Sequence, residues 1–182
     1  MKKIITLLIL LVPYLSQAQK KPSIKRYNMK MGISLLGGIQ NSKGLNTAPV
    51  FGAEISIACP LVHSQKNYIR QYIRFTQQGD ETYKTTSVEL NPQISIFQGA
   101  HFNLGIGPNT GVIFATKDGE QRTRFSYGLG ASTVYSIKKI SFGIGMCFAA
   151  TNKVSFTDTD NKSSEVSHLN NLKTFLKVGY NF

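Results

Sequence analysis

Apolar side chains alternate with small or polar ones over long stretches of this chain, and this alternation constrains the fold more than any other feature. It is clearest over residues 140–151, where the even positions are apolar and the odd positions are Ser, Gly, Cys, Ala or Thr. Successive side chains of a β-strand point to opposite faces, so the pattern predicts a strand with one apolar face. Residues 125–137 repeat it, and only Lys138 and Lys139 separate the two segments, which predicts a tight hairpin.

Weaker alternation marks six further strands, at residues 29–40, 50–59, 67–77, 84–97, 101–115 and 171–182. The connections between the eight segments alternate in length. The loops expected on one side of a barrel are 41–49, 78–83, 116–121 and 152–170. The turns expected on the other side are 60–66, 98–100 and 138–139, of which only 60–66 is longer than expected. Membrane barrels have long loops on one side and short turns on the other. The sequence therefore predicts an all-β fold, an eight-stranded antiparallel up-and-down transmembrane β-barrel over residues 29–182.

The face opposite the apolar one on each predicted strand, called the second face here, indicates which side of the barrel is apolar. A soluble barrel needs many charged groups on its outer face. Here the second face consists mainly of Gly, Ser, Ala and Asn, which suit the narrow lumen of eight strands. Glycines such as Gly130 and Gly145 would leave room there. We therefore expect the apolar face to contact lipid, and a soluble secreted lipocalin-like barrel that binds a small hydrophobic ligand is the alternative.

The acidic residues are confined to a few places. Seven of the nine lie in the predicted longer loops, and the other two, Glu54 and Glu89, fall on the polar faces of their strands. Arg70 and Arg74 share one face of the strand between them. If that face points inward, Glu54, Arg70, Arg74 and Glu89 form a charge network in the lumen. Charges buried there are costly unless they are paired, so the pairing is a requirement of this fold.

The first 18 residues have the features of a signal peptide. Lys2 and Lys3 precede an apolar run, and the small-residue exit Ser16-Gln17-Ala18 follows it. The run is much shorter than the roughly 20 residues of a membrane-spanning helix. Residues 19–28 form a basic N-terminal arm. Because the chain is predicted to be exported, we expect its excess of positive charge to meet lipid headgroups and no nucleic acid.

The last predicted strand ends in an aromatic residue, with Val178, Tyr180 and Phe182 on its apolar face. This ending is similar to the C-terminal signal that outer-membrane barrels present to the barrel-assembly machinery. With the leader and the layout of strands, the chain resembles the PorT-like outer-membrane β-barrel family of Bacteroidota. The resemblance implies the fold, an outer-membrane location in a Gram-negative cell, and contact with outer-membrane lipid, lipopolysaccharide and that machinery. It implies no chemistry.

No catalytic, cofactor or metal site is predicted. His63, His101 and His168 are far apart in the sequence. Ser167 and His168 near Glu165 leave open a lipid-modifying enzyme of the lipid A acylhydrolase type, although neighbouring residues of an extended strand point in opposite directions.

Two further candidates are weak. Asp158 and Asp160 could hold a divalent cation, but an EF-hand would need Gly where Ser163 stands. Cys59 and Cys147 lack metal-site spacing and are expected to be unpaired thiols. The function that the sequence favours is non-enzymatic, either structural or through binding of an extracellular ligand by loop 152–170.

Overall fold

The computed structural model describes residues 31–42, 47–63, 68–79, 83–117, 119–152, 154–157, 163–166 and 170–182. The predicted signal peptide and basic arm, residues 1–28, lie outside these ranges. No helix in this part of the chain is long and apolar enough to cross a membrane.

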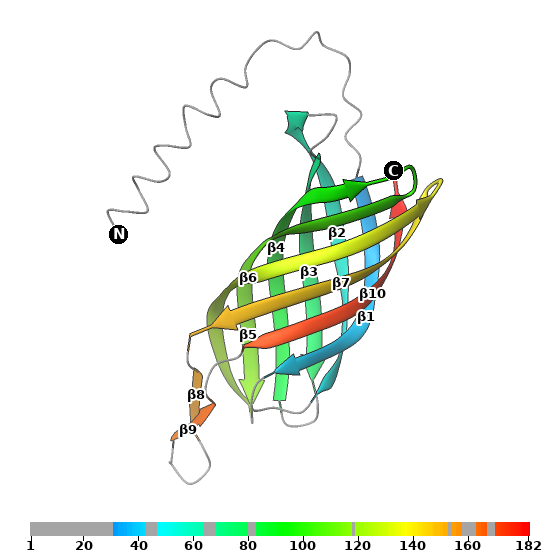
Figure 1. The fold of residues 1–182 in the computed structure, drawn as a ribbon. Coiled ribbons are helices and arrows are strands. Elements are labelled where there is room, and N and C mark those ends of the chain that lie inside the picture. The colour runs from blue at the N-terminus through cyan, green and yellow to red at the C-terminus, as the bar shows by residue number, and fades with distance from the viewer. Residues whose placement is uncertain are drawn as a thin grey trace, which may run out of the picture.

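Eight long antiparallel strands form a closed barrel (Figure 1). They are β1 (Met31–Ser42), β2 (Ala48–His63), β3 (Tyr68–Gly79), β4 (Tyr83–Gln98), β5 (Phe102–Lys117), β6 (Glu120–Ile137), β7 (Ile140–Thr151) and β10 (Asn171–Asn181). Each strand pairs with the next, and β1 pairs with β10 to complete the ring. Closure gives each of these eight strands a neighbour on both sides. The predicted all-β, eight-stranded antiparallel barrel is confirmed.

Three predicted connections are wrong in extent. The turn predicted at 60–66 is partly strand, because β2 continues to His63 after a register shift beyond Ala58. The loop predicted at 116–121 is shorter, since Lys117 pairs with Glu120. The loop predicted at 152–170 contains a small hairpin, β8 (Val154–Thr157) with β9 (Ser163–Val166). At 60–63 and 116–120 the sequence lacks clear alternation, and the alternating run Val154–Thr157 is only four residues long. Strand pairing uses backbone groups and can continue through such segments.

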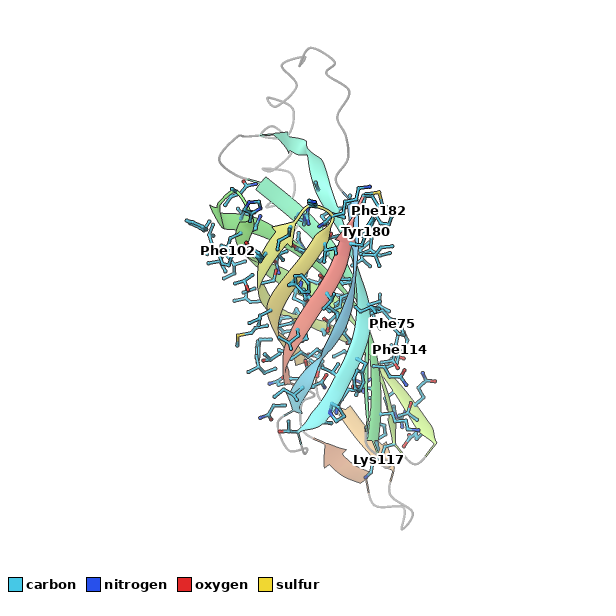
Figure 2. All side chains as sticks on the ribbon, turned by 90° about the vertical axis from the view of Figure 1, so that its right-hand side faces the viewer. Phe75, Phe102, Phe114, Lys117, Tyr180 and Phe182 are labelled. Atoms are coloured by element: carbon cyan, nitrogen blue, oxygen red, sulfur yellow. The ribbon has the colours of Figure 1, made fainter. Side chains whose placement is uncertain are left out.

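Large apolar side chains cover the outside of the barrel (Figure 2). Leu129, Phe142 and Ile144 are 60%, 49% and 52% exposed, and all eight barrel strands carry such residues. The opposite faces are buried and mostly polar. The predicted orientation of the strands is therefore confirmed. The lipocalin-like alternative requires an apolar interior, and this interior is polar and charged.

Glycines on β6 and β7 make space for large inward side chains. A Cβ atom on Gly130 would lie 2.6 Å from Oδ1 of Asn91, and one on Gly145 would lie 2.2 Å from the Phe175 ring. Both contacts are far shorter than van der Waals distances allow. These strand glycines therefore permit the interior of a narrow barrel to be filled by large side chains from nearby strands, Phe175 from the adjacent β10 and Asn91 from β4.

The ladder between β4 and β5 is interrupted where each strand contains a proline. The pairing passes from Leu90 with Thr110 to Ile94 with Ile106, and Pro92 and Pro108 lie between. Neither proline has an N–H to donate. The side chain of Asn91 compensates, because its Nδ2 donates to the carbonyl oxygens of Pro108 at 2.6 Å and Gly107 at 3.3 Å. Asn91 thus supports the wall from inside.

Candidate functional site

Five charged side chains meet inside the barrel, and we call this set the charged plug. Its members come from four strands: Glu54 of β2, Arg74 of β3, Glu89 of β4, and Lys173 and Lys177 of β10. No side chain of the plug is more than 4% exposed. Strand register places Arg74 directly between Glu54 and Glu89, so the alternation on three neighbouring strands brings them to one height.

Arg74 joins the two carboxylates. Its Nη2 and Nε donate to Oε2 of Glu54 at 2.7 and 3.0 Å, and its Nη1 lies 3.5 Å from Oε2 of Glu89. The guanidinium group also lies over the ring of Phe175, 4.4 Å from its centroid. A planar guanidinium can donate hydrogen bonds at its edge while its face stacks on an aromatic ring. Arg74 is therefore held by both kinds of contact.

The two lysines of β10 reach the carboxylates from across the lumen. Nζ of Lys173 donates to Oε1 of Glu89 at 2.5 Å, and also contacts hydroxyl oxygens of Ser87 at 2.7 Å and Thr76 at 2.9 Å. All three of its N–H donors thus have acceptors. In the strand order β4 is four strands from β10 in either direction. The Lys173–Glu89 pair therefore connects opposite walls of the barrel.

Lys177 completes the plug beside Glu54. Its Nζ donates to Oε1 of Glu54 at 2.7 Å and lies 4.5 Å from the centroid of the Tyr72 ring. When all groups are ionised, two carboxylates face three cations. Burying these charges is costly, and close pairing with additional hydrogen bonds offsets that cost. The arrangement forms one connected network of ion pairs that joins β10 to β2, β3 and β4 across the lumen.

A second polar layer lies next to the plug, nearer the end of the barrel where Phe182 lies. Gln93 Nε2 donates to Asn91 Oδ1 at 2.6 Å, and Ser132 Oγ donates to Gln93 Oε1 at 2.6 Å. Cys147 lies against the plug, with Sγ 3.8 Å from Oε2 of Glu89, and it is buried and not in a disulfide. These contacts connect β4, β6 and β7. The interior therefore contains hydrogen-bonded side chains from several strands at two heights.

The structure brings together three of the four residues singled out from the sequence. Glu54, Arg74 and Glu89 are in contact, whereas Arg70 lies farther toward the end of the barrel, with Nη1 3.5 Å from Oγ of Ser56. Lys173 and Lys177 were missed. The signal was present, because the alternation that turns Leu172 and Leu176 outward turns both lysines inward.

The residues predicted to form the assembly signal lie together on the outside of β10. Val178, Tyr180 and Phe182 are 54%, 44% and 68% exposed. The rings of Tyr180 and Phe182 meet edge to face, with centroids 5.3 Å apart. This geometry makes the three side chains available as one apolar surface at the end of the strand.

Most candidates for chemistry fall outside the described residues. These are Ser167, His168, Asp158, Asp160 and the side chain of Cys59. In the described part of the chain, no group of three or more His, Cys, Asp or Glu side chains could hold a metal ion. The structure therefore offers the charged plug as its most elaborate polar site, with carboxylates whose oxygens are occupied by neighbouring cations.

Comparison with known proteins supports the fold. No protein-family model matches the sequence, and a search of curated proteins found no match. Among solved structures, Neisserial surface protein A is similar over 85% of this chain and 96% of its own, with 13% identity and a TM-score of 0.56. Ail of Yersinia pestis, in complex with the heparin analogue sucrose octasulfate, is similar over 86% of this chain and 100% of its own, with 14% identity and a TM-score of 0.50. At this identity the similarity shows a shared barrel fold.

Proposed function

We propose that this chain is an integral outer-membrane β-barrel with a structural or loop-mediated binding role and no catalytic activity. The observation that carries the proposal is the reversal of the usual burial pattern. Apolar side chains such as Leu35 and Leu176 are 70% and 64% exposed, whereas Arg74 and Lys173 are buried. In water this arrangement would expose a large apolar surface. In a bilayer the apolar outer face contacts hydrocarbon, and the charged side chains stay inside the barrel.

The outer membrane is the location that fits a closed barrel of this kind, and the fold shared with Neisserial surface protein A supports it. The resemblance to the PorT-like family of Bacteroidota, with a signal peptide over residues 1–18, belongs to the same proposal. Its partners are then outer-membrane lipid, lipopolysaccharide and the barrel-assembly machinery, which would recognise Val178, Tyr180 and Phe182.

The charged plug supports a structural role over transport. Eight strands enclose a lumen that side chains can fill, and here ion pairs span it from β10 to β4. The β8–β9 hairpin extends from the end opposite Phe182 and supplies a surface for a ligand (Figure 1). Ail, solved with a heparin analogue, shows that a barrel of this fold can bind a ligand.

Cell fractionation and gel migration test the proposal. The protein should sediment with the outer membrane and resist extraction by carbonate. Without boiling it should migrate differently from the boiled, unfolded sample, because a closed barrel stays compact in detergent. Recovery as a freely soluble periplasmic monomer would contradict the proposal.

A further inference from the structure

A cavity of about 390 Å³ opens at the end of the barrel where Phe182 lies. Its walls come from segments far apart in the sequence, namely the β4–β5 turn, the β6–β7 turn, the start of β3 and the end of β10. The cavity lies beyond the second polar layer. No residue of the charged plug lines it, but Tyr72, which does, has its ring 4.5 Å from Nζ of Lys177 of the plug.

The lining of this cavity is basic. Arg70, His101, Lys138 and Lys139 line it, together with the polar side chains of Gln98, Asn103 and Ser136. Among the described residues that form its walls there is no Asp or Glu side chain. A concave surface that gathers like charges focuses the electrostatic potential and attracts ions of the opposite sign. The geometry therefore favours an anion.

Two walls of the cavity are tied together in advance. The backbone N–H of Ser136 donates to the carbonyl oxygen of His101 at 2.7 Å, and His101 Nδ1 lies 3.0 Å from the carbonyl oxygen of Ser136. On the other side, the N–H of Asn181 donates to the carbonyl oxygen of Lys139 at 2.7 Å. Because these walls are already ordered, less conformational entropy is lost when a ligand binds.

The β6–β7 turn has a lysine at a position whose backbone conformation favours other residues. Lys138 has φ of 53°, in the left-handed region that Gly and Asn adopt more readily. The chain thus carries a positive charge at the rim of the cavity in a conformation unfavourable to lysine. Lys139, next to it, lies with Nζ 5.7 Å from the centroid of the Tyr180 ring.

Exposed aromatic residues surround the same end. They include Phe97, Phe102, Tyr135, Tyr180 and Phe182, and Figure 2 shows Phe102, Tyr180 and Phe182 at the end opposite Lys117. Aromatic girdles on membrane barrels lie at the level of the lipid headgroups. Lys138 and Lys139 would then lie at the height of headgroup phosphates.

We propose that this cavity binds a phosphate group, supplied by the headgroup of an anionic phospholipid. Lysine and arginine are the side chains that bind phosphate through charge-assisted hydrogen bonds. The inference rests on the proposed membrane location, because the aromatic residues place the basic rim beside headgroups only in a bilayer.

The test uses the full chain purified in a nonionic detergent and calorimetric titration with short-chain phospholipids. Dihexanoyl phosphatidylglycerol should bind about tenfold more tightly than dihexanoyl phosphatidylcholine, whose choline cation opposes the basic rim. The double variant Lys138→Gly/Lys139→Gln should bind phosphatidylglycerol about tenfold or more weakly than the original chain. Glycine suits the positive φ at position 138, so this variant is expected to fold.

A matched control removes two lysines from the other end of the barrel, Lys84→Gln/Lys117→Gln, and should leave the affinity unchanged. Equal losses in the two double variants, or no preference for phosphatidylglycerol, would overturn the site. Competition with glycerol 3-phosphate identifies the source. Displacement supports recognition of the phosphate alone, and no displacement with retained lipid binding supports recognition of the whole lipid.

The gel migration of the same samples separates this inference from the proposed function. If the chain migrates as a compact barrel and fractionates with the outer membrane but shows no preference for phosphatidylglycerol, only the cavity assignment fails. If the chain is recovered as a soluble protein, the proposed membrane function itself fails.

Discussion

At the scale of single residues, Glu54 has the most demanding position, because it accepts hydrogen bonds from both Arg74 and Lys177. Replacing it, Glu54→Gln, leaves three buried cations with one carboxylate. Loss of one partner from a buried ion pair costs about 3–5 kcal/mol of folding free energy. Urea unfolding of the barrel in phosphocholine micelles, followed by circular dichroism, measures the change.

Two further variants separate a buried pair from a simple loss of charge. Glu54→Gln/Lys177→Met removes both charges of the pair and should recover most of the lost stability, since a neutral pair can replace a buried ion pair at little cost and the Gln amide oxygen can still accept from Arg74. Glu120→Gln removes the acid that pairs with Arg122, where the side chains are 29% and 42% exposed, and should cost about 1 kcal/mol or less. A double variant less stable than Glu54→Gln would contradict this account of the plug.

At the scale of elements, the β8–β9 hairpin is the part of the chain that alternation did not reveal. Phe156 of β8 is 1% exposed, and β8 lies beside β6. A buried aromatic residue in a strand of only four residues is expected to hold the hairpin against the barrel wall.

The variant Phe156→Ala should therefore loosen the hairpin while leaving the barrel intact. We expect trypsin to cut within residues 152–170 about tenfold faster in intact cells, which corresponds to roughly 1.4 kcal/mol of lost packing. Phe125→Ala, which removes a residue 61% exposed on β6, should leave the rate unchanged. Equal cleavage rates for the two variants, or cuts within the barrel strands, would exclude a packing role for Phe156.

For the whole molecule, a surrounding bilayer makes the cost of a charged substitution on the outer face depend on its depth in the membrane. Ile144 and Ile140 lie on β7 and are 52% and 49% exposed. Ile140 is the first residue of the strand, and Ile144 lies farther from the strand end. Ile144→Arg should cost about 2–4 kcal/mol, and Ile140→Arg about 0–1 kcal/mol, because an arginine near the interface reaches water.

Urea unfolding from phospholipid vesicles gives both values under one condition. A soluble barrel would tolerate arginine equally at these two exposed positions, so equal and small costs would refute membrane insertion. The pair tests location independently of the charged plug and of the cavity, since neither residue contributes to them.

The number of long strands, their antiparallel order and the face that each strand turns outward all follow from the alternation of apolar and polar residues along the chain. Alternation carries this information because the side chains of a strand point to opposite faces with a period of two. It even placed Glu54, Arg74 and Glu89 on inward faces of neighbouring strands. Strand ends were less well predicted, as at Pro60 to His63 and at Glu120, because backbone pairing continues where alternation stops.

Which inward side chains meet depends on how the strands close into a barrel. Lys173 reaches Glu89 because closing the barrel places β10 opposite β4, a relation that depends on strand number and register rather than on local pattern. The same closure brings the β4–β5 and β6–β7 turns together around the basic cavity and leaves Arg70 at its wall. Contacts between distant segments arise from the three-dimensional ring, and alternation within one strand cannot specify them.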